Sequence, residues 1–216
     1  MKLLPKHYYQ FYIGCIRLYG VIDSDSAFLI FKKYYPEALK KDFLKDIRAR
    51  NGKYTKKYII WTTYKKNLYL IADDWYNQKD IELIFSLQED KPFYIPNTLE
   101  EFVNCSSFEY WKIFNKKYID GLSSILSKNT KFKVESTLET IFETIRYLSR
   151  QSHFEPLGEI TKRLIKWGYD FNEQELTSVV ALLQEIVNNT KMPCNRGYTP
   201  IELKQYYLDN KDIPNC

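Results

Sequence analysis

The chain has 216 residues, of which 44% are hydrophobic and 27% are charged, a balance typical of globular proteins. This excludes a wholly disordered chain, and the 7 Gly and 8 Pro, scattered without a period, exclude fibrous and collagen-like classes. No apolar run reaches the ~18 residues that a membrane span needs, and the first residues lack the apolar core of a signal peptide. We therefore expect a soluble, cytoplasmic protein with no membrane contact.

The net charge of +5 is unevenly distributed along the chain. Between Lys32 and Lys66, twelve Lys and Arg stand against three acidic residues, a local charge of +9, so the remainder carries −4. Such an asymmetry indicates either a face that binds polyanions or a lysine-rich solvated surface, and the sequence leaves both readings open.

The first stretch of the chain predicts two helices. Apolar and aromatic side chains at spacings of three and four predict a helix over 6–19, which Gly20 ends. Asp23 or Ser24 can cap a second helix, which ends near Pro36 because proline cannot continue it.

A third helix is predicted over about 37–49 and is closed by Asn-Gly. Its inward face would carry Leu39, Phe43 or Leu44, and Ile47. Three basic residues recur at spacings of four and three and share the outward face, namely Lys41, Lys45 and Arg48.

The pattern then changes to β structure. Two β-branched and aromatic runs, 58–63 and 68–71, are separated by four polar residues and predict a hairpin. Further on, two prolines bracket three apolar residues in the segment 90–96, which therefore cannot be helical. We take this crossover as the boundary between a basic N-terminal lobe over 1–90 and a helical C-terminal lobe over 97–216.

The rest of the chain reads as helical. Asp73 or Asp74 starts one helix before the crossover. After it, the predicted helices are 98–104, 107–127 with a break near Asp120 and Gly121, 135–150, 156–167 and 173–189. The fold class predicted from these elements is mainly α, a helical bundle with one small β-hairpin in two lobes.

The chain has few residues of the types that form catalytic and metal-binding sites. His7 and His153 are the two histidines, and the four cysteines form no C-x-x-C pair. No glycine-rich phosphate-binding loop occurs. The pairs of adjacent acidic residues lie at predicted helix starts, where the helix dipole favours negative charge, so they are interpreted as helix caps. We expect no metal, no cofactor and no enzymatic activity.

The basic stretch carries the main functional signal. Lysine and arginine neutralise phosphates, and aromatic rings can stack on unpaired bases. The interleaved aromatic residues are Tyr34, Tyr35, Tyr54, Tyr58, Trp61 and Tyr64. Because base-specific contacts favour Arg and this patch is mostly Lys, we predict phosphate binding without sequence specificity. The predicted nucleic-acid-binding residues are Lys41, Lys45, Arg48, Lys56, Lys57, Lys65 and Lys66.

Three short segments resemble a poorly characterised family of helical proteins from low-GC Gram-positive bacteria and their mobile elements. They are residues 17–22 (RLYGVI), residues 91–97 (KPFYIPN), and residues 188–191 (NNTK) followed by 195–203 (NRGYTPIEL). Many members of that family carry a C-terminal SEC-C zinc knuckle, but this sequence has no clustered cysteines for one, so no metal role is carried over. Lys191 stands where the family usually has Arg. The resemblance implies a helical fold and no particular reaction.

The third of these segments predicts a structural clasp that locks a last short helix onto the bundle. Thr199 would cap that helix, Pro200 would take its first position and Glu202 would complete a capping box. Gly197 is placed for a turn with positive φ, and Asn188 and Asn189 would end the preceding helix.

From these features we expect a non-catalytic adaptor or regulatory protein that binds a nucleic acid or nucleoprotein partner, one version being a phage or mobile-element inhibitor of a host factor. Two alternatives stay open. Arg146 and His153 have a spacing allowed in HEPN-type ribonucleases, which are also helical, although Tyr147 stands where they have a polar group. The other alternative is a purely protein–protein module whose acidic C-terminal lobe docks a basic partner.

Overall fold

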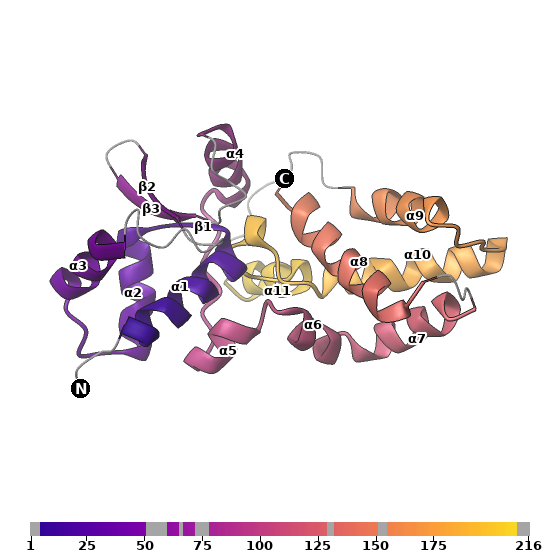
Figure 1. The fold of residues 1–216 in the computed structure, drawn as a ribbon, viewed down its shortest axis with the longest axis horizontal. Helices are drawn as coiled ribbons and strands as arrows, with labels where there is room; N and C mark the ends of the chain where they lie inside the picture. The colour runs from indigo at the N-terminus through magenta and orange to yellow at the C-terminus, as the bar shows by residue number, and fades with distance from the viewer. Residues whose placement is uncertain are drawn as a thin grey trace. The chain divides into compact units, whose positions relative to one another are not determined.

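The computed structural model describes residues 5–50, 60–64, 67–71, 78–128, 132–150 and 155–210. Over these residues it confirms a mainly α fold with a small β element (Figure 1). The chain divides into two compact units, Met1–Ser107 and Phe108–Cys216. Where the structure describes it, no helix is both long and apolar enough to cross a membrane.

The N-terminal unit contains helices α1 to α5. Their bounds are α1 Pro5–Tyr19, α2 Ser24–Tyr34, α3 Lys40–Arg50, α4 Gln78–Gln88 and α5 Leu99–Asn104. Gly20 ends α1 with a φ of 72°, as predicted. Asp23 is the cap of α2, because its Oδ1 accepts hydrogen bonds from the N–H groups of Asp25 and Ser26 at 3.0 and 2.8 Å. Asp73 and Asp74, predicted to start α4, lie outside the described residues.

The predicted start of α3 and the predicted orientation of Leu39 are wrong. The helix begins at Lys40, and Leu39 precedes it with 53% of its side chain exposed. The carbonyl of Leu39 accepts from the N–H groups of Asp42 and Phe43, so its backbone supports the first turn while its side chain faces solvent.

The predicted hairpin is confirmed, and a third strand joins it. Strands β1 (Val21–Asp23), β2 (Ile60–Tyr64) and β3 (Asn67–Ile71) form an antiparallel sheet in the order β1-β3-β2. β1 has three residues, too few for an alternating pattern to reveal it. Helices α1 and α2 both contact β1 and β3 and so cover one face of the sheet (Figure 1).

The core of this unit is built from aromatic rings. Phe11 of α1 stacks on Phe102 of α5 with ring centroids 5.2 Å apart and meets Phe31 of α2 edge-on at 5.0 Å. Gly14 permits this approach, because a Cβ there would lie 2.4 Å from the ring of Phe102.

Because α1 and α5 are in contact, the boundary between the units lies later in the chain than predicted. We expected the division at 90–96, but α5 belongs to the N-terminal unit, which ends at Ser107. The extended crossover is attached to the same unit, since the hydroxyls of Tyr19 and Tyr34 donate to the carbonyls of Tyr94 and Pro96 at 2.8 and 2.9 Å.

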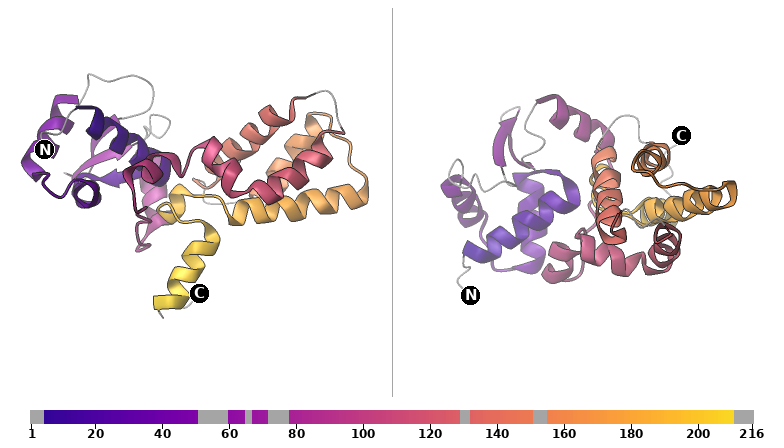
Figure 2. Two further views of the ribbon diagram at one scale, coloured as in Figure 1. Left: turned by 90° about the horizontal axis from the view of Figure 1, so that it is seen from below. Right: turned by 45° about the vertical axis from the view of Figure 1, so that its right-hand side comes forward.

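The C-terminal unit is a helical bundle. Its helices are α6 Phe108–Phe114, α7 Lys116–Leu126, α8 Val134–Leu148, α9 Pro156–Lys166, α10 Glu173–Asn188 and α11 Pro200–Asn210, with a 3₁₀ turn at Pro193–Asn195. α7 and α9 each contact both α8 and α10, so these four helices enclose one core. The left view of Figure 2 shows α11 leaving the end of α10 at a steep angle.

The helix predicted over 107–127 is interrupted at a different place from the one expected. The break lies at Asn115, which is 1% exposed and whose backbone N–H and side-chain Nδ2 both donate to the carbonyl of Trp111, at 2.9 and 3.1 Å. Gly121 lies inside α7 instead. A Cβ there would lie 3.2 Å from Cδ2 of Leu182, so the glycine serves the packing of α7 against α10.

Candidate functional site

The outward face of α3 presents three basic side chains. Phe43 and Ile47 are fully buried on one side of the helix. Lys41, Lys45 and Arg48 are all exposed, at positions that a turn of 100° per residue puts on the opposite side. They are about 6 and 4.5 Å apart along the helix axis, at a rise of about 1.5 Å per residue.

Within the parts of the chain that the structure describes, no carboxylate forms an ion pair with these three cations. The neighbouring Lys40 is paired with Asp25 at 3.0 Å. Asp46 faces the other way and accepts a hydrogen bond from the hydroxyl of Tyr12 at 3.0 Å. The face therefore keeps its positive charge available to an external anion.

The other predicted basic residues, Lys56, Lys57, Lys65 and Lys66, lie outside the described residues, as do Tyr54, Tyr58 and the side chains of Trp61 and Tyr64. Two of the interleaved aromatic residues are described. Burial raises the pKa of Tyr34, whose hydroxyl donates to Pro96, and the ring of Tyr35 lies 4.7 Å from that of Phe31. Both half-buried rings pack within the protein, so their predicted role in base stacking is not supported.

One of the two residues proposed for ribonuclease chemistry, Arg146, is buried. Arg146 is 6% exposed, and its guanidinium carbon lies 5.5 Å from the ring centroid of Phe142. His153 lies outside the described residues. No group of three His, Cys, Asp or Glu that could hold a metal ion occurs in the described parts of the chain.

The local geometry predicted for the clasp is confirmed, but α11 buries a single residue, Leu203, so the helix is held mainly at its first turn. In the capping box, the N–H of Glu202 donates to Oγ1 of Thr199 at 3.1 Å and the N–H of Thr199 donates to Oε2 of Glu202 at 2.8 Å. Gly197 has the expected positive φ, 86°. Asn188 is the last residue of α10.

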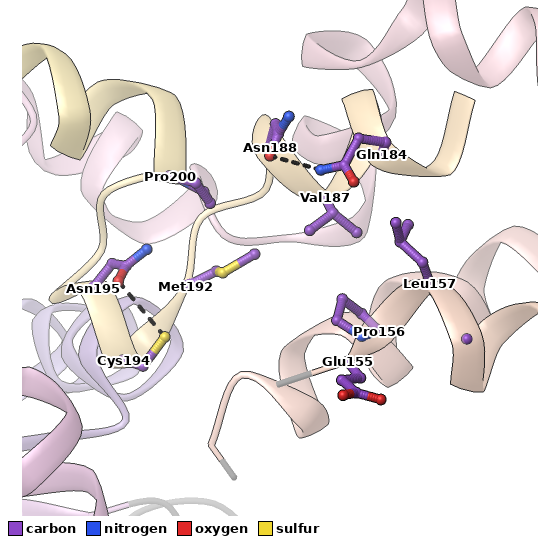
Figure 3. Close-up of a pocket in the computed structure, with 11 residues that line it drawn as sticks. Glu155, Pro156, Leu157, Gln184, Val187, Asn188, Met192, Cys194, Asn195 and Pro200 are labelled. Atoms are coloured by element: carbon purple, nitrogen blue, oxygen red, sulfur yellow. Dashed lines mark hydrogen bonds between the residues drawn. The ribbon is translucent and has the colours of Figure 1, made fainter. Parts of the chain in front are cut away.

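A cavity of about 560 Å³ lies in the C-terminal unit (Figure 3). It is bounded by the first turn of α9, the last turns of α10 and the clasp. Its apolar side chains include Leu157, Val187 and Met192. The close-up shows Val187 and Met192 on one side of the space and Leu157 with Pro156 on the other. The cavity was not predicted, because its walls come from segments that meet only in the folded chain.

Known proteins do not add to these observations. No family model, curated protein or solved structure matches the chain. The resemblance to the helical family of Gram-positive bacteria stays a prediction from three short segments.

Proposed function

We propose that the protein is a non-catalytic cytoplasmic adaptor or regulator that binds a nucleic acid, alone or in a nucleoprotein, through the outward face of α3. The observation that carries the proposal is the set of three exposed cations, Lys41, Lys45 and Arg48, on a helix whose opposite face is buried. None of the three has an ion pair within the described residues.

Electrostatics supports a phosphate backbone as the target. The three cations span about 10 Å along α3, a length over which duplex DNA carries roughly six negative charges. Each phosphate that is neutralised releases counterions, so binding weakens steeply with salt. Because two of the three residues are lysines, which act as point charges, contacts with phosphates are favoured over base recognition.

The burial of Arg146 supports a binding function over the ribonuclease alternative. A residue that acts on an RNA phosphate has to reach its substrate, and Arg146 packs on Phe142 instead. The finer version, a phage or mobile-element inhibitor that covers the nucleic-acid-facing surface of a host factor, rests on the resemblance to a family found on mobile elements.

Fluorescence anisotropy with labelled single-stranded RNA and duplex DNA at several salt concentrations tests the proposal. The triple variant Lys41→Glu, Lys45→Glu, Arg48→Glu should bind weakly to every sequence alike. For single strands, the log–log salt slope should become shallower by about 0.7 for each phosphate that the variant no longer neutralises. Far-ultraviolet circular dichroism should be unchanged, because Phe43 and Ile47 are untouched.

A control variant with the same change in net charge distinguishes binding by the α3 face from electrostatic attraction of the nucleic acid to the protein as a whole. Lys162, Lys166 and Lys204 are exposed in the C-terminal unit, and their replacement by Glu should leave affinity largely intact. An equal loss in both triple variants, salt-independent binding, or undiminished binding by the α3 variant would remove this face from the mechanism. Salt-independent or undiminished binding would favour the protein–protein module instead.

A further inference from the structure

The cavity in the C-terminal unit has the size and lining of a small-molecule site. Its volume of about 560 Å³ falls in the range of roughly 300–1,000 Å³ that ligand pockets occupy. Val187 and Met192 are buried and give it an apolar wall. The site lies within one unit and is independent of the α3 face.

A glycine lies on the edge of this space. Gly158 lies in the first turn of α9 and lines the cavity. A Cβ at this position would have no atom within 4 Å, whereas a Cβ at Gly14 or Gly121 would press against a neighbour. Glycine is less favourable than alanine in a helix, and packing does not require it here. Gly158, which is exposed, therefore adds no side chain to this part of the lining, and a larger residue there would occupy space beside the cavity.

Two polar residues of the lining, Glu155 and Gln184, offer acceptors to a ligand. Glu155 precedes α9, and its carboxylate makes no capping hydrogen bond. Gln184 donates from Nε2 to Oδ1 of Asn188 at 3.1 Å, which leaves its Oε1 available. Among the described residues that line the cavity, none is Lys or Arg, so the lining does not compensate a negative charge.

We infer that this cavity binds a small organic molecule with an apolar body and a head group that donates N–H hydrogen bonds, either a carboxamide or an ammonium. The apolar body lies against Val187 and Met192, and the head group donates to Oε1 of Gln184 or to the carboxylate of Glu155. An anion of the same shape is disfavoured beside the carboxylate of Glu155, whose charge no described Lys or Arg of the lining offsets.

Methionine-methyl NMR provides a direct test, since the sequence has 2 Met, Met1 and Met192, and Met192 lines the cavity. The full chain, labelled with ¹³C at the methionine methyl, is titrated with benzamide, benzylammonium and benzoate. These probes share one apolar body and differ in the head group. The Met192 signal, assigned by its loss in Met192→Leu, should shift saturably with benzamide or benzylammonium. Affinity for benzoate should be lower by about tenfold or more, the loss expected for one charge-assisted hydrogen bond.

Three variants locate the site and separate the two head groups. Gly158→Leu fills the space and should abolish the shift. Gln184→Ala, at an exposed position that does not threaten the fold, should weaken binding of the nitrogen-bearing probes and leave benzoate unchanged. Glu155→Gln should weaken benzylammonium alone if the ligand is a cation. Equal binding of all three probes, tighter binding of benzoate, no saturable shift with any probe, or a shift that survives Gly158→Leu in a folded variant would each overturn the inference.

Discussion

Nζ of Lys191 donates to both carboxylate oxygens of Glu202, at 2.7 and 2.6 Å, and the lysine side chain is only 8% exposed. The same carboxylate accepts from the backbone N–H of Thr199 through Oε2. One side chain thus joins the end of α10 to the start of α11 and also completes the helix cap. Glu202 is the residue on which the clasp depends most.

Glu202→Gln should lower the free energy of unfolding by about 1–3 kcal/mol, because it leaves a buried ammonium without its counter-charge. Urea unfolding measures the loss. Glu143→Gln, at an exposed residue of α8, is the matched control and should change stability by less than about 0.5 kcal/mol. The double variant Lys191→Met, Glu202→Gln should lose less than the sum of the single variants. A Glu202→Gln protein as stable as the wild type would contradict the role given to the pair.

Gly14→Ala and Gly158→Ala should have opposite effects on stability. At Gly14 the new Cβ would lie 2.4 Å from the ring of Phe102, so α1 and α5 must move apart, at a cost of about 1–3 kcal/mol. At Gly158 the Cβ meets no atom within 4 Å, and the better helix former should add up to about 1 kcal/mol. Both values come from denaturant unfolding. A neutral Gly14→Ala would mean that the two helices do not approach so closely.

Thr190→Val should destabilise the C-terminal unit by about 1–3 kcal/mol, since it leaves a buried indole donor unsatisfied. Oγ1 of Thr190 accepts from Nε1 of Trp111 at 2.9 Å and donates to the carbonyl of Ile186 at 2.6 Å. Thr177→Val is a control on α10, because Thr177 is exposed and its hydroxyl donates to the carbonyl of Glu173 in its own helix at 2.9 Å. Equal losses in the two variants would show that the hydrogen bond with Trp111 contributes nothing.

Stability should depend on acid pH through Glu175. A hydrogen bond from Lys128, followed by the backbone N–H of Asn172, lowers the pKa of Glu175 below its ordinary value of 4.5. The folded state therefore holds this proton less tightly than the unfolded state does. The resulting stabilisation is fully present above pH 4.5 and is lost as the pH falls through the lowered pKa.

Unfolding experiments over a pH series measure this effect. The stability difference between the wild type and Glu175→Gln should be constant above pH 4.5 and should shrink below it. Lys128→Met removes the main cause and should reduce the same pH dependence. A difference that stays constant into strong acid would contradict the assignment.

Features that depend on neighbours in the chain were predictable from sequence. The stop at Gly20, the cap at Asp23 and the capping box of Thr199 and Glu202 each involve residues no more than four positions apart. Helix α8 was equally predictable, because its apolar residues recur at spacings of three and four and form one buried face. The outward position of Lys41, Lys45 and Arg48 followed from the same periodicity.

Features that depend on residues far apart in the chain were decided by tertiary contacts. Gly121 reads as a helix breaker but lies within α7, because Leu182 of α10 needs the space. The N-terminal unit extends to Ser107 because Phe102 packs on Phe11, ninety-one residues earlier in the chain. β1 exists because Val21 and Ile22 pair with Ile71 and Leu70. The cavity beside Gly158 has the same origin, since α9, α10 and the clasp become neighbours only after folding buries their apolar faces together.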